Sequence, residues 1–492
     1  MNRRLAAAAV AWALAAGAAV LPDDVAEGLF RTAQQLERGG QTEQAREAYA
    51  RVVEQAPRSE RADDALLALA RLAWPIAEPE QLGTAADTTR WAEARGHLAR
   101  IVTEYARADS APEALWRLGL LLLDPDGPER DPDDATARLL ALPELYPDSP
   151  RAAQALALVA MIDAGARRDD RALENAFRVL WAWPAASGAA SQAWLAAGEV
   201  SARGARTELA LVCLGRAGTG SGEAARRAVR LAALVDRIAS GAGREAWKID
   251  LDRQLALPER VDDLAAAPDG RLFAAMEREN AVAEIDPSGE RASRRPMAGV
   301  IGVALDAWSR PWLLTGEAIV GPAAVGRIAL PEDVDATALA IVGARGLWLA
   351  DSRGRRVVRL APGGTIEAAA PLAGRGDPRA LAPGTDGGVV VLDARNRRIL
   401  RFDARGAPAG RIELAGTVGR PVDVDVDRLG ALYVLDADGQ VVVLDREGAL
   451  VARVALPRDG ERAIARPERL AVDEAGRIAV ADGRRRRITW LR

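Results

Sequence analysis

The chain has 492 residues, and 49% of them are hydrophobic, which is enough for two or three domains with buried cores. Its formal net charge of −4 offers no general attraction for nucleic acid or an anionic membrane surface, so neither is expected as a partner. The single cysteine, Cys213, excludes an intramolecular disulfide and any cysteine-based metal site.

The N-terminus has the layout of a secretory signal peptide. Arg3 and Arg4 precede an apolar run from Leu5 to Leu21, and Ala16-Gly17-Ala18 offers a small-residue cleavage site. An uncleaved anchor is the alternative, because this run is only just long enough to span a membrane. We expect residues 1–18 to be a signal peptide and the mature protein to be exported, periplasmic or extracellular, in a bacterium. The chain would then meet the membrane only transiently, through this segment.

Helical periodicity follows from residue 23 to about residue 240, with Ala and Leu at three- and four-residue steps. Ala33, Ala45, Tyr49 and Pro57 are separated by 12, 4 and 8 residues. By this spacing a helix hairpin packs small residues against an aromatic ring and then turns at proline. The stretch resembles the tetratricopeptide repeat (TPR), with weaker copies behind it. The resemblance implies a curved α-solenoid over residues 23–240 whose groove binds a peptide or protein partner.

The C-terminal part, residues 245–492, repeats short runs of β-forming residues divided by turn residues. Each unit is predicted to be a four-stranded antiparallel blade. The intervals between copies are 40, 35, 42, 43 and 46 residues, which suits a propeller. The six copies open near Val261, Ile301, Ala336, Pro378, Pro421 and Pro467.

Two kinds of residue recur at fixed places in the blades. The third strand is followed by a turn glycine, predicted to have positive φ: Gly289, Gly364, Gly406 and Gly448. The second strand ends in an aspartate: Asp351, Asp393, Asp436 and Asp482. We interpret these carboxylates as caps of the turn that follows, and a ring of calcium ligands is the alternative.

The ends of this region predict how the ring closes. The last copy stops at Arg492 directly after a third strand, and a spare strand lies in Ala246–Leu255, before the first copy. Pairing the two completes the sixth blade and removes the open sheet edges. The region resembles the NHL-type six-bladed β-propeller. The predicted fold is therefore multidomain, α plus all-β: a TPR-like solenoid followed by a propeller closed by an N-terminal outer strand.

Histidine-dependent chemistry is disfavoured. The single histidine, His97, lies in a predicted helix with no second ligand near it in sequence, and the propeller has none. Lyases and metal enzymes with similar propellers generally use histidine as a base or ligand, so the resemblance disfavours those activities. A Ser-His or Cys-His nucleophile in the propeller is excluded for the same reason.

The residues that open the blades are the candidate binding site. Residues beside the start of an innermost strand surround a mouth of the central channel. A cationic rim with a few acids suits an anionic or carboxylate-bearing ligand, including an acidic protein tail; a solvated rim without a partner is the alternative. The rim residues are Arg260, Asp377, Arg379, Arg420, Asp423, Arg466 and Glu468.

These observations predict a non-enzymatic, protein-binding scaffold without a cofactor or metal. The solenoid groove and the propeller face would each present an interaction surface, and an envelope-associated assembly is one setting for such a scaffold. The alternative is a calcium-dependent, lactonase-like propeller hydrolase that uses carboxylates at the channel mouth. It would need an asparagine beside those carboxylates, and the propeller contains only Asn280 and Asn396.

Overall fold

The computed structural model describes residues 22–84, 89–239, 249–322, 325–343, 346–460 and 463–491. The chain divides into two compact units, one up to Val159 and one from Ala160 onward. The predicted signal peptide lies outside the described residues. In the parts that are described, no helix is both long and apolar enough to cross a membrane.

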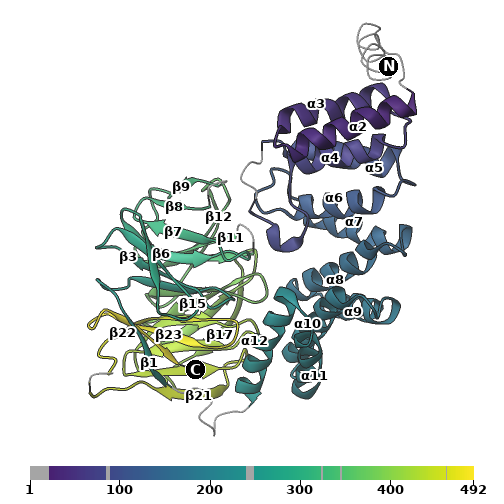
Figure 1. Cartoon of the computed structure of the whole chain (residues 1–492). Helices are drawn as coiled ribbons and strands as arrows, with labels where there is room; N and C mark the ends of the chain where they lie inside the picture. Colours follow the sequence, from purple (N-terminus) through teal and green to yellow (C-terminus); the bar gives the residue numbers. More distant parts are fainter. Residues whose placement is uncertain are drawn as a thin grey trace. The chain divides into compact units, whose positions relative to one another are not determined.

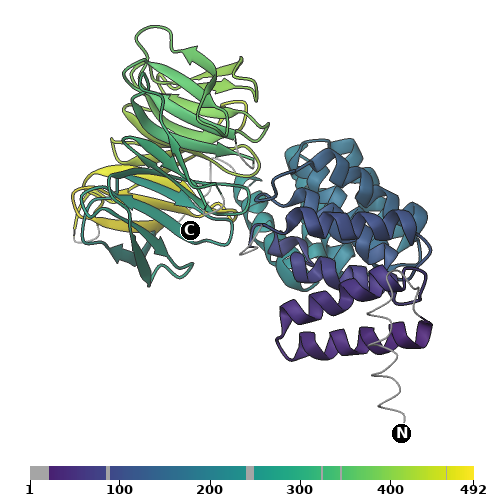
Figure 2. The same ribbon diagram turned by 90° about the horizontal axis from the view of Figure 1, so that it is seen from above.

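The first unit is a stack of antiparallel helix pairs (Figures 1 and 2). His97 lies on the fifth of these elements, α5, where its Nε2 is 3.5 Å from a carboxylate oxygen of Glu93. The elements are α2 (Asp23–Arg38), α3 (Thr42–Gln55), α4 (Ala62–Ala73), the short 3₁₀ helix η1 (Pro79–Gln81), α5 (Trp91–Glu104), α6 (Ala111–Leu123), α7 (Pro132–Leu145) and α8 (Pro150–Gly165), which continues into the second unit.

The first helix pair carries the predicted repeat positions in its core. Ala33 on α2 and Ala45 on α3 are fully buried, and Tyr49 lies against Phe30 with their ring centroids 5.5 Å apart. The Tyr49 hydroxyl donates a 2.8 Å hydrogen bond to Glu37. Pro57 follows the end of α3, and its carbonyl accepts a 2.6 Å hydrogen bond from the hydroxyl of Tyr105, at the end of α5, which ties the first pair to the second. The predicted helical repeats are confirmed.

The second unit begins with helices and continues into the propeller (Figure 1). The helices are the end of α8, α9 (Asp169–Ala182), α10 (Ser187–Arg203), α11 (Thr207–Gly218) and α12 (Gly222–Ala239). The change from helix to strand lies between Ala239 and Ile249. The compact units nevertheless divide at Val159, so α9 to α12 belong to the same unit as the propeller.

The strands form six four-stranded antiparallel sheets, which confirms the predicted propeller. In each of the first five blades the strands follow one another from the inside outward. They are β2 (Asp263–Ala266), β3 (Leu272–Met276), β4 (Ala281–Ile285) and β5 (Ala292–Pro296); β6 (Val300–Leu305), β7 (Pro311–Thr315), β8 (Ala318–Val320) and β9 (Arg327–Ala329); β10 (Ala336–Val342), β11 (Gly346–Asp351), β12 (Arg356–Leu360) and β13 (Ile366–Pro371); β14 (Pro378–Pro383), β15 (Val389–Asp393), β16 (Arg398–Phe402) and β17 (Pro408–Glu413); and β18 (Pro421–Val426), β19 (Leu432–Asp436), β20 (Gln440–Leu444) and β21 (Leu450–Ala455).

The sixth blade combines the two ends of the propeller. Its strand order is β22 (Pro467–Val472), β23 (Ile478–Asp482), β24 (Arg487–Leu491) and then β1 (Ile249–Ala256) on the outside. Gln254 of β1 pairs with Thr489 of β24, and Leu255 pairs with Ile488. The predicted closure by an N-terminal outer strand is confirmed, and the pairing covers the edge that β24 would otherwise expose.

Apolar side chains fill the space between neighbouring blades. Each of the six blade-to-blade boundaries encloses one cluster of buried aliphatic and aromatic residues. In the boundary between the sixth and first blades, for example, Trp490 packs with Leu264 and Met276. The innermost strands contact one another around the ring, including β2 with β22, so their inward edges form the wall of a central channel.

Candidate functional site

A cavity of about 470 Å³ occupies the central channel. The innermost strand of every blade contributes to its wall, and the last turn of α8 and part of α10 line it at one end. The wall is mixed: aliphatic residues of the strands are interspersed with many carboxylates and guanidinium groups. Small-molecule sites are usually cavities of about 300–1,000 Å³, and this cavity has that size, with a wall that carries more charged groups than is usual.

Two neighbouring acids of β18 lie in the channel wall. Alternation of Val and Asp in Val422–Asp427 places Asp423 and Asp425 on the same side of the strand, towards β22. Asp423 accepts hydrogen bonds from the backbone N–H of Val424 at 3.0 Å and of Leu470 at 2.8 Å. Asp425 does the same with Val426 and Val472, both at 2.8 Å. Each carboxylate therefore joins two blades.

Burial raises the pKa of both carboxyls. The pKa of Asp423 rises from 3.8 to about 7, mainly because the group is desolvated, with Arg469 opposing the rise and Asp263 adding to it. The pKa of Asp425 also rises to about 7, again through burial, against the hydrogen bonds from Val472 and Val426. Both groups therefore change charge near neutral pH, which suits general acid–base chemistry.

Asp263 and Arg469 complete this group from two other blades. Asp263 on β2 accepts hydrogen bonds from the N–H groups of Leu264 at 3.0 Å and Val303 at 2.9 Å. Burial raises its pKa, and Arg469 on β22 opposes that rise. The Nε of Arg469 is 3.8 Å from an oxygen of Asp263 and donates to the carbonyl of Asp262 at 2.5 Å. One guanidinium thus influences the acids of the first and fifth blades.

Asp427 follows β18 at the opposite end of the cavity, where it organises a turn. It accepts 2.9 Å hydrogen bonds from three successive N–H groups, those of Leu429, Gly430 and Ala431, and a 3.0 Å bond from the Tyr433 hydroxyl. Burial raises its pKa to about 6. With four donors already bound, Asp427 is better suited to hold the turn than to act on a ligand.

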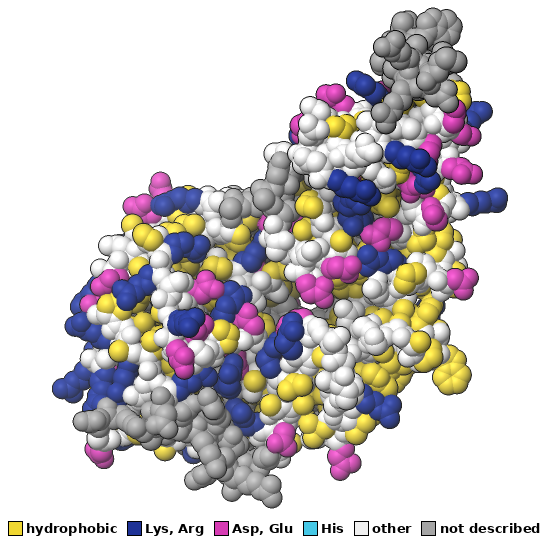
Figure 3. Space-filling view, in the orientation of Figure 1, with side chains coloured by type: hydrophobic (Ala, Val, Ile, Leu, Met, Phe, Trp, Pro, Cys, Tyr) yellow, Lys and Arg dark blue, Asp and Glu magenta, His cyan; other side chains and the backbone are white. Residues whose placement is uncertain are grey.

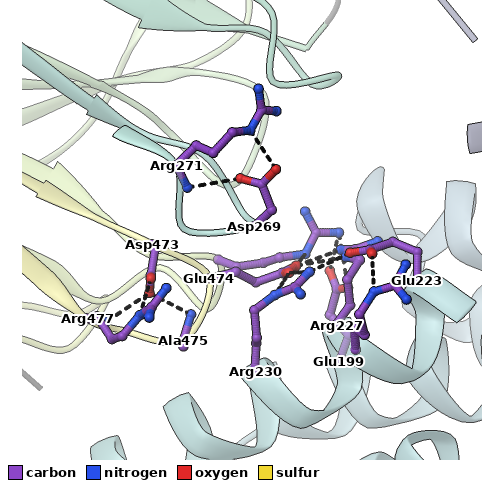
Figure 4. Close-up of polar contacts among 12 residues, drawn as sticks. Glu199, Glu223, Arg227, Arg230, Asp269, Arg271, Asp473, Glu474, Ala475 and Arg477 are labelled. Carbon is purple, nitrogen blue, oxygen red and sulfur yellow. Dashed lines mark hydrogen bonds and ion pairs between the residues drawn. The ribbon is translucent and has the colours of Figure 1, made fainter. Parts of the chain in front are cut away.

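A network of buried ion pairs lies at this end of the channel (Figure 4). Glu474, on the turn after β22, accepts hydrogen bonds from Arg227 at 2.9 Å and Arg230 at 3.2 Å, both on α12. Glu199 on α10 pairs with Arg428 of the propeller at 3.1 Å. The helices α10 and α12 are thereby fixed to the propeller turns beside Asp427.

The charged state of this network is favoured despite its burial. Desolvation opposes ionisation of Glu199, but Arg428, Arg227 and Arg203 outweigh it and lower the pKa of Glu199. Glu199 and Glu474 are only 2% and 3% exposed, so neither pair is a surface contact. Removing one member would leave buried charge uncompensated.

The predicted rim residues fall into three groups. Asp423 lies within the channel wall, whereas Arg379 lines both the channel cavity and a second pocket described below. At the mouth where the innermost strands begin, Glu468 pairs with Arg466 at 2.8 Å and with Arg260 at 3.3 Å. Asp377 and Arg420 line the second pocket. The structure therefore does not bring the seven residues together in one site.

The repeated aspartates lie at the ends of their second strands, away from the channel cavity, and are almost completely buried. Asp351 accepts hydrogen bonds from Gly354 at 2.9 Å and Arg356 at 2.6 Å. Asp393, Asp436 and Asp482 bind backbone N–H groups of the following turn in the same way. The turn glycines Gly289, Gly364, Gly406 and Gly448 have φ values of 75°, 87°, 88° and 94°.

The channel does not fit the calcium site that a lactonase-like propeller would use. Asn280 and Asn396 lie in turns between strands and do not line the channel cavity. Among the described residues, the one group of three or more potential ligands close enough to share a metal ion is Asp63, Asp64 and Asp109, in the first unit. We therefore assign no step to calcium.

Sequence reasoning missed Asp263, Asp425, Arg469 and the network around Glu474. The alternation of Val and Asp in Val422–Asp427 was the available signal, since it predicts that Asp423 and Asp425 share one side of a strand. No comparable pattern surrounds Asp263 or Arg469. Their proximity depends on closure of the ring, which brings the first, fifth and sixth blades around one channel.

Comparisons with known proteins agree with the fold. The family model described as tetratricopeptide repeat matches residues 27–59. The chain matches none of the curated proteins with which it was compared. Among solved structures it is similar to a streptogramin B lyase, with 14% identity, a TM-score of 0.40, and coverage of 50% of this chain and 97% of the lyase.

Two further similar structures are a gluconolactonase from Xanthomonas campestris and a calcium-binding protein, regucalcin, from Agrobacterium tumefaciens. The gluconolactonase has 18% identity and a TM-score of 0.39, covering 48% of this chain and 88% of its own. Regucalcin has 18% identity and a TM-score of 0.38, covering 50% and 92%. At these identities and TM-scores, the likeness shows the fold alone.

The prediction of a non-enzymatic scaffold is corrected by these comparisons. Two of the three similar structures are named as enzymes and the third as a calcium-binding protein, so a propeller of this kind is not in itself a sign of a non-enzymatic scaffold. Which reaction this chain's own channel suits has to be argued from its residues.

Proposed function

We propose that the channel is the active site of a hydrolase that acts on small esters or lactones. The observation that carries the proposal is the position of Asp423. Its carboxyl, with a pKa of about 7, lies in the wall of a 470 Å³ cavity and is influenced by the guanidinium of Arg469. A base poised near neutral pH beside a fixed cation suits acyl transfer to water.

In this proposal, ionised Asp423 takes a proton from a water molecule as the water oxygen forms a bond to the substrate carbonyl carbon. Each Asp423 oxygen accepts one backbone hydrogen bond and keeps a second lone pair for this role. Negative charge then develops on the former carbonyl oxygen, which Arg469 stabilises. When the carbon–oxygen ester bond breaks, protonated Asp423 returns its proton to the departing alkoxide, leaving an acid and an alcohol.

The surroundings favour a small substrate that enters from one side. The network of Glu199, Arg428 and Glu474 occupies the end of the channel beside α10 and α12. This leaves the mouth where the innermost strands begin for entry. The channel acids are desolvated by burial, and in such an environment a proton transfer and a charge on oxygen are more sensitive to nearby groups than in water.

The test is turnover of a panel of small esters and lactones by the full chain and by Asp423→Asn. Asp445→Asn is the matched control, because Asp445 also accepts two backbone hydrogen bonds, at 3.0 and 2.7 Å, but lies in an outer turn. We expect the rate to fall at least 100-fold in Asp423→Asn and to stay unchanged in Asp445→Asn. Equal rates in both variants, or no turnover of any substrate in the panel, would refute the proposal.

Assays after treatment with a chelator test whether the reaction requires a metal ion. Because the channel carboxylates do not fit a calcium site, we expect turnover to persist after dialysis against EDTA. Activity that disappears with EDTA and returns with calcium would show instead that a metal is required.

We also propose that the protein acts outside the cytoplasm. The proposal rests on the arginine pair and apolar run of residues 1–21. Cell fractionation of a C-terminally tagged chain tests it: export predicts a shortened protein in the periplasm or medium, and full-length protein in the cytoplasm would contradict it.

A further inference from the structure

A second pocket, of about 620 Å³, opens between the third, fourth and fifth blades on the face where the innermost strands begin. Its lining contains six arginines and one acid, Asp377. The arginines are Arg355, Arg375, Arg379, Arg395, Arg397 and Arg420. The view in Figure 3, by contrast, shows cationic and anionic side chains interspersed over the visible propeller surface. The pocket is therefore a local excess of positive charge on a chain whose net charge is −4.

Most of this charge is not neutralised by the protein. Arg420 pairs with Asp438 at 2.8 Å. Within the described residues, the other five arginines form no ion pair with an acid, and all five are exposed. The opposite side of the same mouth differs, because Arg260 and Arg466 both pair with Glu468 there. Repulsion among five unpaired guanidiniums is unfavourable unless an anion binds among them.

The backbone gives an independent argument. Five blades share a position in the turn between two neighbouring strands, where the residue has a positive φ. The carbonyl of this residue accepts a hydrogen bond from a backbone N–H of the outer strand or of the segment beyond it. Its occupants are Asn280, Arg355, Arg397, Gly439 and Arg486, with φ values of 48°, 49°, 49°, 88° and 53°. Gly and Asn adopt this conformation most readily, and other residues pay about 1–2 kcal/mol. Arginine is thus an unfavourable choice for the turn itself.

The arginines at this turn position differ in the partners of their side chains. Arg486 donates to the Pro258 carbonyl at 3.1 Å and lies 3.7 Å from Glu259, so it has partners in the protein. Arg355 and Arg397 line the pocket instead, and neighbouring Arg375 is also strained, with a φ of 59°. Strained residues persist mainly where function requires their side chains. Here the strained residues place their guanidinium groups around the second pocket.

We propose that this pocket binds a small molecule bearing at least two phosphate or sulfate groups. The planar guanidinium fork matches such oxyanions with two parallel hydrogen bonds. Five available arginines and 620 Å³ exceed what one such group can use. Arg379 lines both this pocket and the channel cavity, so the bound anion lies beside the channel mouth. The inference does not depend on the proposed hydrolysis.

The test is calorimetric titration of the full chain with inorganic pyrophosphate, beside orthophosphate and sulfate, at low and physiological salt. We expect pyrophosphate to bind more tightly than either single anion, and more weakly as salt increases. In the double variant Arg355→Asn/Arg397→Asn, affinity should fall at least tenfold while the melting temperature stays equal or rises, because asparagine fits the positive φ. A merely structural role for these arginines would lower the melting temperature.

Two controls keep the result interpretable. Arg486→Asn changes the equivalent position of the sixth blade, outside the pocket, and should leave affinity unchanged. Arg395→Gln removes one pocket charge without changing a strained residue and should weaken binding even if the double variant folds poorly. Absence of pyrophosphate binding at low salt, or equal loss of affinity in Arg486→Asn, would overturn the proposal.

A lipid arm distinguishes the source of the phosphate. Vesicles of phosphatidylglycerol with phosphatidylcholine are mixed with the full chain and floated on a density gradient. We expect no flotation above that of phosphatidylcholine vesicles alone. If the chain floats with the anionic vesicles, if this requires Arg395, and if pyrophosphate does not bind, the ligand of the pocket is a lipid headgroup at a membrane surface and not a small molecule.

Discussion

The carboxylate of Asp423 on β18 accepts a 2.8 Å hydrogen bond from the backbone N–H of Leu470 on β22, one blade further around the ring. The inward edge of an innermost strand has no neighbouring strand to pair with, so its N–H groups need other acceptors. Asp425 and Asp263 meet the same need at Val472 and Val303. The acids of the channel thus link neighbouring blades as well as being available to a ligand.

This double role makes stability depend on pH. The pKa of Asp425 is about 7 in the folded chain and near 3.8 when unfolded. Between these values the folded chain holds a proton that the unfolded chain has lost, so stability increases as pH falls from 8 towards 5. Asp425→Asn removes this term. As the pH falls from 8 to 5.5, we expect the free energy of unfolding of the wild-type chain to rise by about 2 kcal/mol more than that of the variant.

Urea unfolding followed by tryptophan fluorescence measures that difference. Asp445→Asn is the control, and its pH dependence should match the wild type. If Asp425→Asn shows the same pH dependence as the wild type, the pKa of Asp425 is ordinary and this carboxyl does not couple folding to pH.

Glu474 fixes α12 to the propeller through Arg227 and Arg230. Glu474→Ala leaves these guanidiniums without their buried acceptor, so we expect it to lower the free energy of unfolding by about 3–5 kcal/mol. Glu413→Ala removes an exposed partner of Arg411 instead and should cost less than about 0.5 kcal/mol. Chemical denaturation compares the two. Equal, small effects would mean that the network does not hold the helices in place.

Trp490 on β24 tests the closure of the ring. It is 3% exposed, packs between the sixth and first blades, and carries Arg253 of β1 over its ring at 4.8 Å. Trp490→Ala should cost about 3–5 kcal/mol. Trp181→Ala on α9 is matched in residue type but 90% exposed, and should change stability by no more than about 0.5 kcal/mol. Thermal unfolding distinguishes them, and a mild effect of Trp490→Ala would contradict the closed sixth blade.

Arg469 has a distinct effect on the proposed reaction. Its charge opposes the rise in the pKa of Asp423, so Arg469→Gln should raise that pKa further. We expect a rate about 100-fold lower and a pH–rate profile displaced to higher pH. Steady-state assays across pH measure both. A lower rate with an unmoved profile would assign Arg469 to substrate binding without influence on Asp423.

The sequence predicted the propeller well because its signals are local. Short runs of β-forming residues, the turn glycines such as Gly448 and the spare strand before residue 256 are each recognisable within a few residues. The candidate site was predicted less well. Asp423 was placed on the rim although it lies in the wall, and Arg428 meets Glu199 across 229 residues of chain. Such long-range contacts depend on how the blades and helices pack, and no short sequence pattern encodes that packing.

The central claim is that Asp423 is the base of a channel active site. The measurement that tests it most directly is the pH dependence of kcat/KM for an ester or lactone substrate, in the wild type and in Asp423→Asn. We predict that the wild-type value rises with pH through about 7, following ionisation of Asp423, and that the variant has a low, flat profile. A variant that retains the wild-type rate and the wild-type profile would contradict the account.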